Sequence, residues 1–182
     1  MINEWLKKLS SHEAEAPPFP VTRPGADGGL FTYATDKHTL AVCRGTAVFK
    51  EKPNRFTETM IQTAWAFLSS PATCAGQIDV GMLQEILGAP DWGPDRGAPS
   101  NYIMIRGVSF GVHVIGRAVA AWPSVLATAF LTPARLKDGN GDPTDAHVLI
   151  LSDGADLRVL CASFDRVTDT YKETKLPDGV LL

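Results

Sequence analysis

Apolar residues at the start of the chain recur at the spacing of an amphipathic helix, i, i+3, i+4 and i+7. These apolar positions are Ile2, Trp5, Leu6 and Leu9. Two cationic residues, Lys7 and Lys8, lie outside this stripe. The pattern predicts an N-terminal amphipathic helix within residues 1–16.

The segment that follows has a composition that interrupts regular structure. Residues 17–29 contain four prolines and three glycines. Each proline removes a backbone donor, and each glycine removes a restraint on the backbone. We therefore predict a linker over residues 17–29.

From residue 30 onward, apolar runs alternate with polar steps, which predicts a single α+β domain over residues 30–182. Two segments rich in β-branched and aromatic residues lie on either side of a short polar segment, and this pattern indicates a hairpin. A later helix has Asp79 as a candidate N-cap and Gly88 as a stop. The predicted strands cover residues 30–34, 40–49, 102–110, 125–131, 147–151 and 157–164. The predicted helices cover residues 55–69, 79–88 and 111–122.

Two segments of this domain have similar sequences. The segments are TDKHTLAV at 35–42 and SDGADLRV at 152–159. In each, a hydroxyl residue and an Asp are followed by three variable positions, a Leu, one variable position and a Val. Asp can cap its own turn, and Leu and Val two positions apart face the same side of a strand. One interpretation is an internal repeat, which would give an antiparallel sheet built from β-α-β-β-β units and packed by helices. The other is that two unrelated hairpins share these features.

The segment ATDKHTLA, residues 34–41, resembles the sequence Ala-Thr-Asp-Gly-His-Arg-Leu-Ala of the bacterial DNA polymerase sliding clamp, the β subunit, in six of eight places. That family is built from β-α-β-β-β units, so the resemblance implies a DNA-clamp-like fold. It also implies a noncatalytic scaffold that binds a short peptide of a partner in a hydrophobic groove, in DNA replication. The matched segment contains no groove residue, so no binding residue is carried over.

The chain differs from that family in two respects. A clamp protomer has three such domains, whereas the 182 residues here hold one, or one with a truncated neighbour. The inner helices of a clamp are basic, whereas the helix predicted at 55–69 has Arg55 against Glu58. The resemblance therefore implies the fold more strongly than DNA encirclement.

Composition and charge narrow the function classes. The net charge is −3, which gives no overall field favouring a polyanion. Three widely spaced cysteines argue against a disulfide framework and for a reducing compartment. We see neither a signal peptide nor a membrane span, and therefore expect a cytoplasmic protein.

These observations favour a noncatalytic protein-interaction module that binds through a sheet edge or an apolar groove. The candidate partner-binding residues are Asp36, His38 and Trp92. For Asp36 and His38 the alternative is a capped turn with a surface histidine. For Trp92 the alternative is burial under a long loop.

Two other functions remain open. The first is a small hydrolase or small-molecule-binding protein, with Asp36, His38 and the acidic loop at 138–145 as its polar residues. The second is an accessory protein that touches nucleic acid. The candidate contacts for it are Lys7, Lys8, Lys50, Lys52 and Arg55.

We expect neither a metal site nor a cofactor. The loop beginning at Asp138 has acidic or amide residues at the first, third and fifth positions of a calcium loop. Position six is Pro143 and position twelve is Leu149, where such a loop needs glycine and glutamate. The sequence also lacks a zinc-binding pattern, a Walker motif and a dinucleotide fingerprint.

Overall fold

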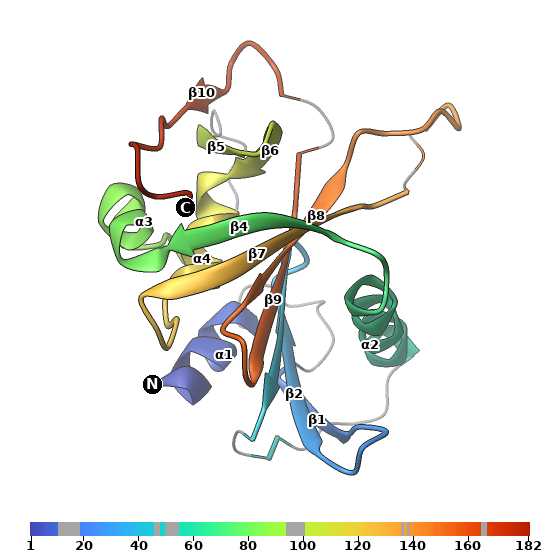
Figure 1. Cartoon of the computed structure of the whole chain (residues 1–182). Helices are drawn as coiled ribbons and strands as arrows, with labels where there is room; N and C mark the ends of the chain where they lie inside the picture. Colours follow the sequence, from blue (N-terminus) through green and yellow to red (C-terminus); the bar gives the residue numbers. More distant parts are fainter. Residues whose placement is uncertain are drawn as a thin grey trace.

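The computed structural model of the chain describes residues 1–10, 19–45, 48–49, 55–93, 101–135, 137, 139–164 and 167–182, with the backbone alone at 55 and 56 (Figure 1). The helices are α1 (Ile2–Ser10), α2 (Arg55–Leu68), α3 (Val80–Leu87) and α4 (Val112–Val119). The strands are β1 (Val21–Pro24), β2 (Leu30–Thr35), β3 (Thr39–Arg44), β4 (Thr73–Asp79), β5 (Asn101–Ile105), β6 (Val108–Gly111), β7 (Leu126–Pro133), β8 (His147–Ser152), β9 (Leu157–Ala162) and β10 (Lys172–Glu173).

The strands form one large antiparallel sheet and one small sheet. The large sheet has seven strands in the order β1-β2-β3-β9-β8-β7-β4, and the small one has the order β10-β5-β6. The predicted α+β fold class is thus confirmed. The central strand of the large sheet is β9, which pairs with β3 on one side, where Leu40 lies opposite Leu160, and with β8 on the other.

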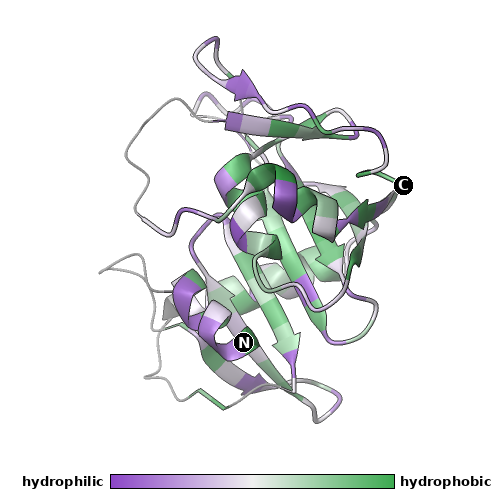
Figure 2. Cartoon of the chain, turned by 90° about the vertical axis from the view of Figure 1, so that its left-hand side faces the viewer, coloured by the Kyte–Doolittle hydropathy of each residue, from purple (hydrophilic) through white to green (hydrophobic). Residues whose placement is uncertain are grey.

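Helices cover both faces of the large sheet. Leu149 and Leu151 of β8 point to the face that packs against α1, α3 and α4, whereas Val148 and Ile150 point to the face under α2. Because both faces are covered, β8 is apolar at consecutive positions and does not alternate with polar residues. In Figure 2 the strands in the interior are coloured mainly as hydrophobic, and α1 carries hydrophilic residues on its outer side.

The helices form where the apolar pattern predicts them. In α1 the buried residues are Trp5, Leu6 and Leu9. In α3 the carboxylate of Asp79 accepts a hydrogen bond from the Met82 N–H at 2.9 Å, which is a side-chain N-cap. Gly88 follows the last turn with φ 68°, where glycine is favoured.

Three local predictions differ from the structure. The segment predicted as a linker contains β1, which pairs with β2 at the edge of the large sheet. The single strand predicted at 102–110 is the hairpin β5–β6, because Arg106 and Gly107 both adopt positive φ and reverse the chain. Strand β4 was not predicted, since it has few β-formers and a bulge between Cys74 and Gly76 interrupts its register.

The two similar segments both form hairpin turns, β2–β3 and β8–β9. Oδ1 of Asp36 accepts hydrogen bonds from the N–H groups of His38 and Thr39, at 3.0 and 2.7 Å. Oδ1 of Asp153 accepts from Ala155 and Leu157 in the second turn, at 2.8 and 3.0 Å. The shared Asp therefore caps its own turn in both places.

Other parts of the chain occupy both edges of the large sheet. At β1, the Thr22 N–H donates to the Phe49 carbonyl at 3.2 Å, and Pro24 farther along the strand has no N–H. At β4, Gln77 and Leu182 exchange two backbone hydrogen bonds of 3.3 and 2.8 Å. The guanidinium of Arg106 donates to the Ala75 carbonyl at 2.8 Å. At these positions neither edge is open to a further strand.

Helix α2 buries the hydroxyl of Thr57. The Thr57 side chain is fully buried, and its Oγ1 has no partner among the described residues. Replacing Thr57 by the similarly shaped valine removes this unsatisfied group, so we expect a gain in unfolding free energy of about 1 kcal/mol. Urea denaturation measures it, with Thr63→Val as the control, because the exposed Thr63 hydroxyl donates to the Thr59 carbonyl. A loss of stability in Thr57→Val would contradict this reading of the site.

Two of the three free cysteines are buried, and their burial predicts a dependence of stability on pH. Burial, with smaller effects from Asp153 and Asp156, raises the pKa of Cys43 from 9.0 to about 11. The thiol of the unfolded chain therefore loses its proton at lower pH than that of the folded chain. Stability from this group is complete below pH 9 and falls as pH rises toward about 11.

We expect Cys43→Ala to reduce the alkaline slope of the unfolding free energy. Cys74→Ala, at an exposed thiol, is the control and should leave the slope unchanged. The measurement is urea denaturation at pH values from neutral to alkaline, with the slope compared separately from the absolute stability. Equal slopes for Cys43→Ala and the unchanged protein would show that the prediction is wrong.

Candidate functional site

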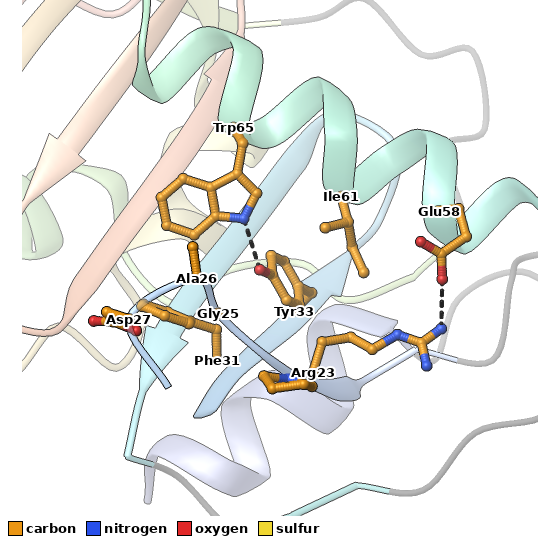
Figure 3. A pocket seen from close by; sticks show the side chains of 10 residues that line it. Arg23, Gly25, Ala26, Asp27, Phe31, Tyr33, Glu58, Ile61 and Trp65 are labelled. Atoms are coloured by element: carbon orange, nitrogen blue, oxygen red, sulfur yellow. Dashed lines mark hydrogen bonds and ion pairs between the residues drawn. The ribbon is translucent and has the colours of Figure 1, made fainter. Parts of the chain in front are cut away.

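A groove runs between α2 and strands β1 and β2, on the sheet face that α2 covers only in part (Figure 3). Its volume is about 790 Å³. Side chains two positions apart on a strand point to the same face, so Phe31 and Tyr33 of β2 form the sheet wall. Ile61 and Trp65, one turn apart on α2, form the opposite wall.

Trp65 is the exposed apolar residue of this groove, with 38% of its surface accessible. Its ring meets Phe31 edge-to-face, with ring centroids 5.3 Å apart. Its indole N–H donates to the Tyr33 hydroxyl oxygen at 2.8 Å (Figure 3). These contacts hold the indole in a fixed orientation at the groove surface.

Tyr33 is a buried hydrogen-bond donor at the base of the groove. Its side chain is almost fully buried, and its hydroxyl hydrogen has no acceptor among the described residues. Burial raises the pKa of Tyr33, opposed by the weaker effects of the Trp65 hydrogen bond and the Arg23 charge. The hydroxyl is therefore protonated at neutral pH and can donate.

The charged residues of the groove form ion pairs with one another. The Arg23 guanidinium lies 2.8 Å from a Glu58 carboxylate oxygen, on the rim. The Arg44 guanidinium lies 3.0 Å from a carboxylate oxygen of Asp27 and also stands over the Phe31 ring, 5.6 Å from its centroid. The groove thus presents aromatic and aliphatic surface between two ion pairs.

The turn between β1 and β2 closes one side of the groove, and it depends on a glycine. A Cβ at Gly25 would lie 2.4 Å from a ring carbon of Phe31, so a side chain there would displace that ring. The turn is closed by the Gly25 N–H, which donates to the Gly29 carbonyl at 2.7 Å. Gly25 therefore allows Phe31 to lie against the turn.

A second, smaller hollow adjoins the groove on the same face. Its volume is about 330 Å³, and it shares Phe31 and Trp65 with the first. Val42, Leu68 and Arg158 also line it. The two hollows together extend the groove along α2 and across the sheet.

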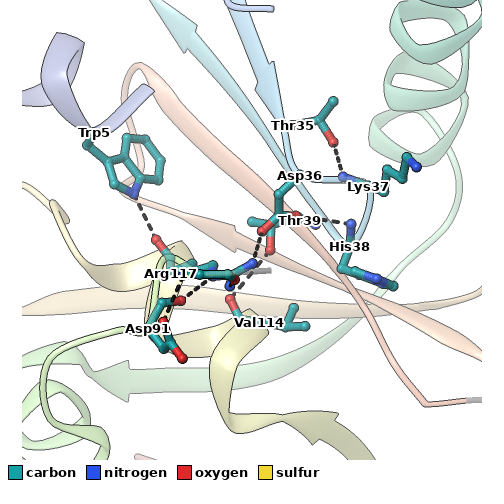
Figure 4. A network of polar contacts seen from close by, with 10 residues as sticks. Trp5, Thr35, Asp36, Lys37, His38, Thr39, Asp91, Val114 and Arg117 are labelled. Atoms are coloured by element: carbon teal, nitrogen blue, oxygen red, sulfur yellow. Dashed lines mark hydrogen bonds and ion pairs between the residues drawn. The ribbon is translucent and has the colours of Figure 1, made fainter. Parts of the chain in front are cut away.

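Asp36 lies in a buried network (Figure 4). Its carboxylate side chain is 2% exposed and lies 3.2 Å from the guanidinium of Arg117, which is 5% exposed. Arg117 also donates to the carbonyls of Asp91 at 2.7 Å and Gly93 at 2.9 Å. The carbonyl of Arg117 accepts the Trp5 indole N–H at 2.7 Å. The network joins the β2–β3 turn, α4, the loop at 91–93 and α1, and leaves the Asp36 carboxylate inaccessible to a partner.

The other two candidate partner-binding residues lie apart from the α2 groove. His38 is exposed on the β2–β3 turn, with its ring 6.2 Å from that of His113. Trp92 is half-buried and packs against the core that contains α1 and α4. That core belongs to the face opposite α2.

The candidate nucleic-acid contacts that the structure describes lie on different elements. Lys7 and Lys8 are exposed on α1, and Arg55 begins α2 on the opposite face of the sheet. Lys50 and Lys52 lie outside the described residues.

The described residues contain neither a cluster of three His, Cys, Asp or Glu side chains able to hold a metal ion nor a helix long and apolar enough to cross a membrane. Asp138 of the loop considered for calcium lies outside the described part of the chain. The groove beside α2 is suited to binding, because it combines apolar walls with one buried hydrogen-bond donor, the Tyr33 hydroxyl.

Sequence reasoning missed every residue of this groove. Phe31, Tyr33 and Trp65 were assigned only to a strand and a helix. The signal that was present is the position of Trp65 on α2, one residue beyond the buried Ala64 and therefore at the border of the buried stripe.

No protein family model and no curated protein matches the chain. Its structure is similar to that of the DNA polymerase III subunit beta from Borrelia burgdorferi, solved in complex with a natural product, with a TM-score of 0.52 and 8% sequence identity. The match covers 91% of this chain and 61% of that chain. The similarity is one of fold. It supports the clamp-like architecture that the segment at 34–41 implied, and this chain spans about three-fifths of the other.

Proposed function

We propose that the chain is a noncatalytic protein-interaction module with a sliding-clamp-like fold, and that it binds a partner protein in the groove beside α2. The observation that carries this proposal is the exposed Trp65, held by Tyr33 and Phe31 in a groove of about 790 Å³. Exposed aromatic residues in apolar hollows are typical of residues that dominate binding energy at protein interfaces.

The groove is favoured over a sheet edge as the binding surface. Residues Thr22 at one edge and Gln77 at the other already bond to Phe49 and Leu182 of the same chain. A partner strand would have to displace these segments, whereas the groove needs no displacement. We therefore assign the interaction to the groove.

The similarity to a DNA polymerase subunit suggests which partners to test first. Proteins that act together with DNA polymerases are the first candidates, in the cytoplasm, where free thiols such as those of the buried Cys43 and Cys161 persist.

The experiment compares a variant in the groove with a matched variant elsewhere. Trp65→Glu places a charge among apolar walls, and Val125→Glu makes the same type of change at an exposed position outside the groove. Affinity purification from host extract should recover a partner with the unchanged protein and Val125→Glu, and lose it with Trp65→Glu. Direct binding of the purified partner then gives the affinity of each variant. Equal retention by both variants would refute the groove as the binding site.

A further inference from the structure

We infer that the α2 groove takes an extended, uncharged peptide segment, and that Tyr33 recognises it by donating a hydrogen bond to one of its backbone carbonyls. This inference rests on the proposed function, since it names the class of partner segment that the same groove binds. Three features of the groove support it: its charges, its buried donor and its two hollows.

The charges of the larger hollow favour an uncharged occupant there. Arg23 is paired with Glu58, and Asp27 with Arg44, at 2.8 and 3.0 Å. A charged side chain in the larger hollow would lose its hydration beside charges that are already paired, which is unfavourable. Apolar side chains instead bury their surface against Phe31, Ile61 and Trp65 at no such cost.

The Tyr33 hydroxyl favours an occupant that carries a hydrogen-bond acceptor. The oxygen accepts from Trp65, while the hydrogen has no acceptor among the described residues. An occupant that excludes water from the base of the groove leaves this donor unsatisfied unless it brings an acceptor itself. Every residue of a peptide backbone brings a carbonyl oxygen.

The two hollows favour an extended peptide over a compact small molecule. The larger one, about 790 Å³, is by itself within the usual range for small-molecule sites, which is about 300–1,000 Å³. The smaller hollow continues it on the other side of Phe31 and Trp65, which line both hollows. In an extended peptide, side chains two positions apart point to the same side, about 7 Å apart. We propose that one such pair occupies the two hollows, with the backbone between them crossing Phe31 and Trp65, which line both.

The test begins with a displayed library of short random peptides selected on the unchanged protein. The selected peptides are synthesised, and their dissociation constants are measured by fluorescence anisotropy. We expect sequences with apolar residues two positions apart and no net charge, and we expect Trp65→Glu to abolish binding. Tyr33→Phe, which removes only the hydroxyl, should raise Kd roughly three- to tenfold.

A change in the peptide isolates the hydrogen bond to its carbonyl. Replacing a backbone amide by an ester weakens the preceding carbonyl as an acceptor and leaves the side chains unchanged. At one position this replacement should raise Kd with the unchanged protein but have no effect with Tyr33→Phe. This comparison separates loss of the bond from any loss of packing, because both proteins meet the same side chains.

The possible failures are distinguishable. If no selected peptide depends on Trp65, the proposed binding in the groove is refuted, and this inference falls with it. If binding depends on Trp65 but the selected peptides are charged, or if Tyr33→Phe and the ester leave Kd unchanged, the groove remains the site. The identity of its occupant as an uncharged segment read by Tyr33 is then wrong.

Discussion

Replacing Arg117 by alanine is expected to lower the free energy of unfolding by about 3–5 kcal/mol. The Arg117 side chain is 5% exposed, and the Asp36 carboxylate 3.2 Å away is 2% exposed. Without the guanidinium, Asp36 remains as a buried charge that has lost its counter-ion. The carbonyls of Asp91 and Gly93 lose their donors at the same time.

A matched variant isolates the effect of burial. Arg23 also forms an ion pair, with Glu58, but their side chains are 32% and 57% exposed. Solvent screens this pair, so we expect Arg23→Ala to cost less than about 1 kcal/mol. Urea denaturation measures both variants, and similar losses for the two would contradict the assigned role of burial.

The pair can also be tested by removing both charges. Asp36→Asn keeps an oxygen that can cap the turn at His38 and Thr39. The double variant Asp36→Asn, Arg117→Ala should therefore be more stable than Arg117→Ala alone, because no charge is left buried. A double variant less stable than the single one would indicate that Asp36 contributes through another contact.

Replacing Gly76 by alanine is expected to lower the free energy of unfolding by about 1–3 kcal/mol and to release the C-terminal segment from β4. Gly76 has φ 110°, a conformation that residues with a Cβ rarely adopt. An alanine Cβ there would also lie 2.6 Å from the Leu182 carbonyl oxygen, which is closer than van der Waals contact.

Release of this segment has its own measurement. Hydrogen exchange should accelerate at the amides of Gln77 and Asp79, which donate to Leu182 and Val180. Gly116→Ala is the control, since a Cβ in this α4 position meets Pro90 at an ordinary 3.8 Å. A helical glycine replaced by alanine should gain about 0.5–1 kcal/mol. Unchanged exchange at Gln77 in Gly76→Ala would show that the contact with Leu182 does not hold the segment.

The sequence was sufficient to predict elements that have a regular apolar period or a local cap. Helix α1 follows from its stripe, and α3 from Asp79 and Gly88, because these signals are local in the chain. Strand β4 and the β5–β6 turn were missed because their conformation depends on distant partners. In β4 the partners are β7 on one side and Leu182 on the other.

The candidate site could not be predicted for the same reason. Tyr33 and Trp65 are 32 positions apart in the chain, and only the packing of α2 on the sheet brings them together. Asp36 was listed as a partner-binding candidate with a capped turn as the alternative, and the structure shows the capped turn. Its second contact, with Arg117, is 81 positions away in the chain. Polar residues near a turn are easily recognised in a sequence, whereas an aromatic groove becomes visible only in the fold.

The pairing of β3 with the central strand β9 also limits when the large sheet can form during synthesis. Thr39 of β3 lies opposite Cys161 of β9, so the middle of the large sheet joins residues that the ribosome produces at very different times. Strands β1 to β3 leave the ribosomal exit tunnel without the neighbour that completes their sheet. Strand β3 lacks this neighbour until residues 157–162 have been synthesised, and we therefore expect the large sheet to form slowly and only after that point.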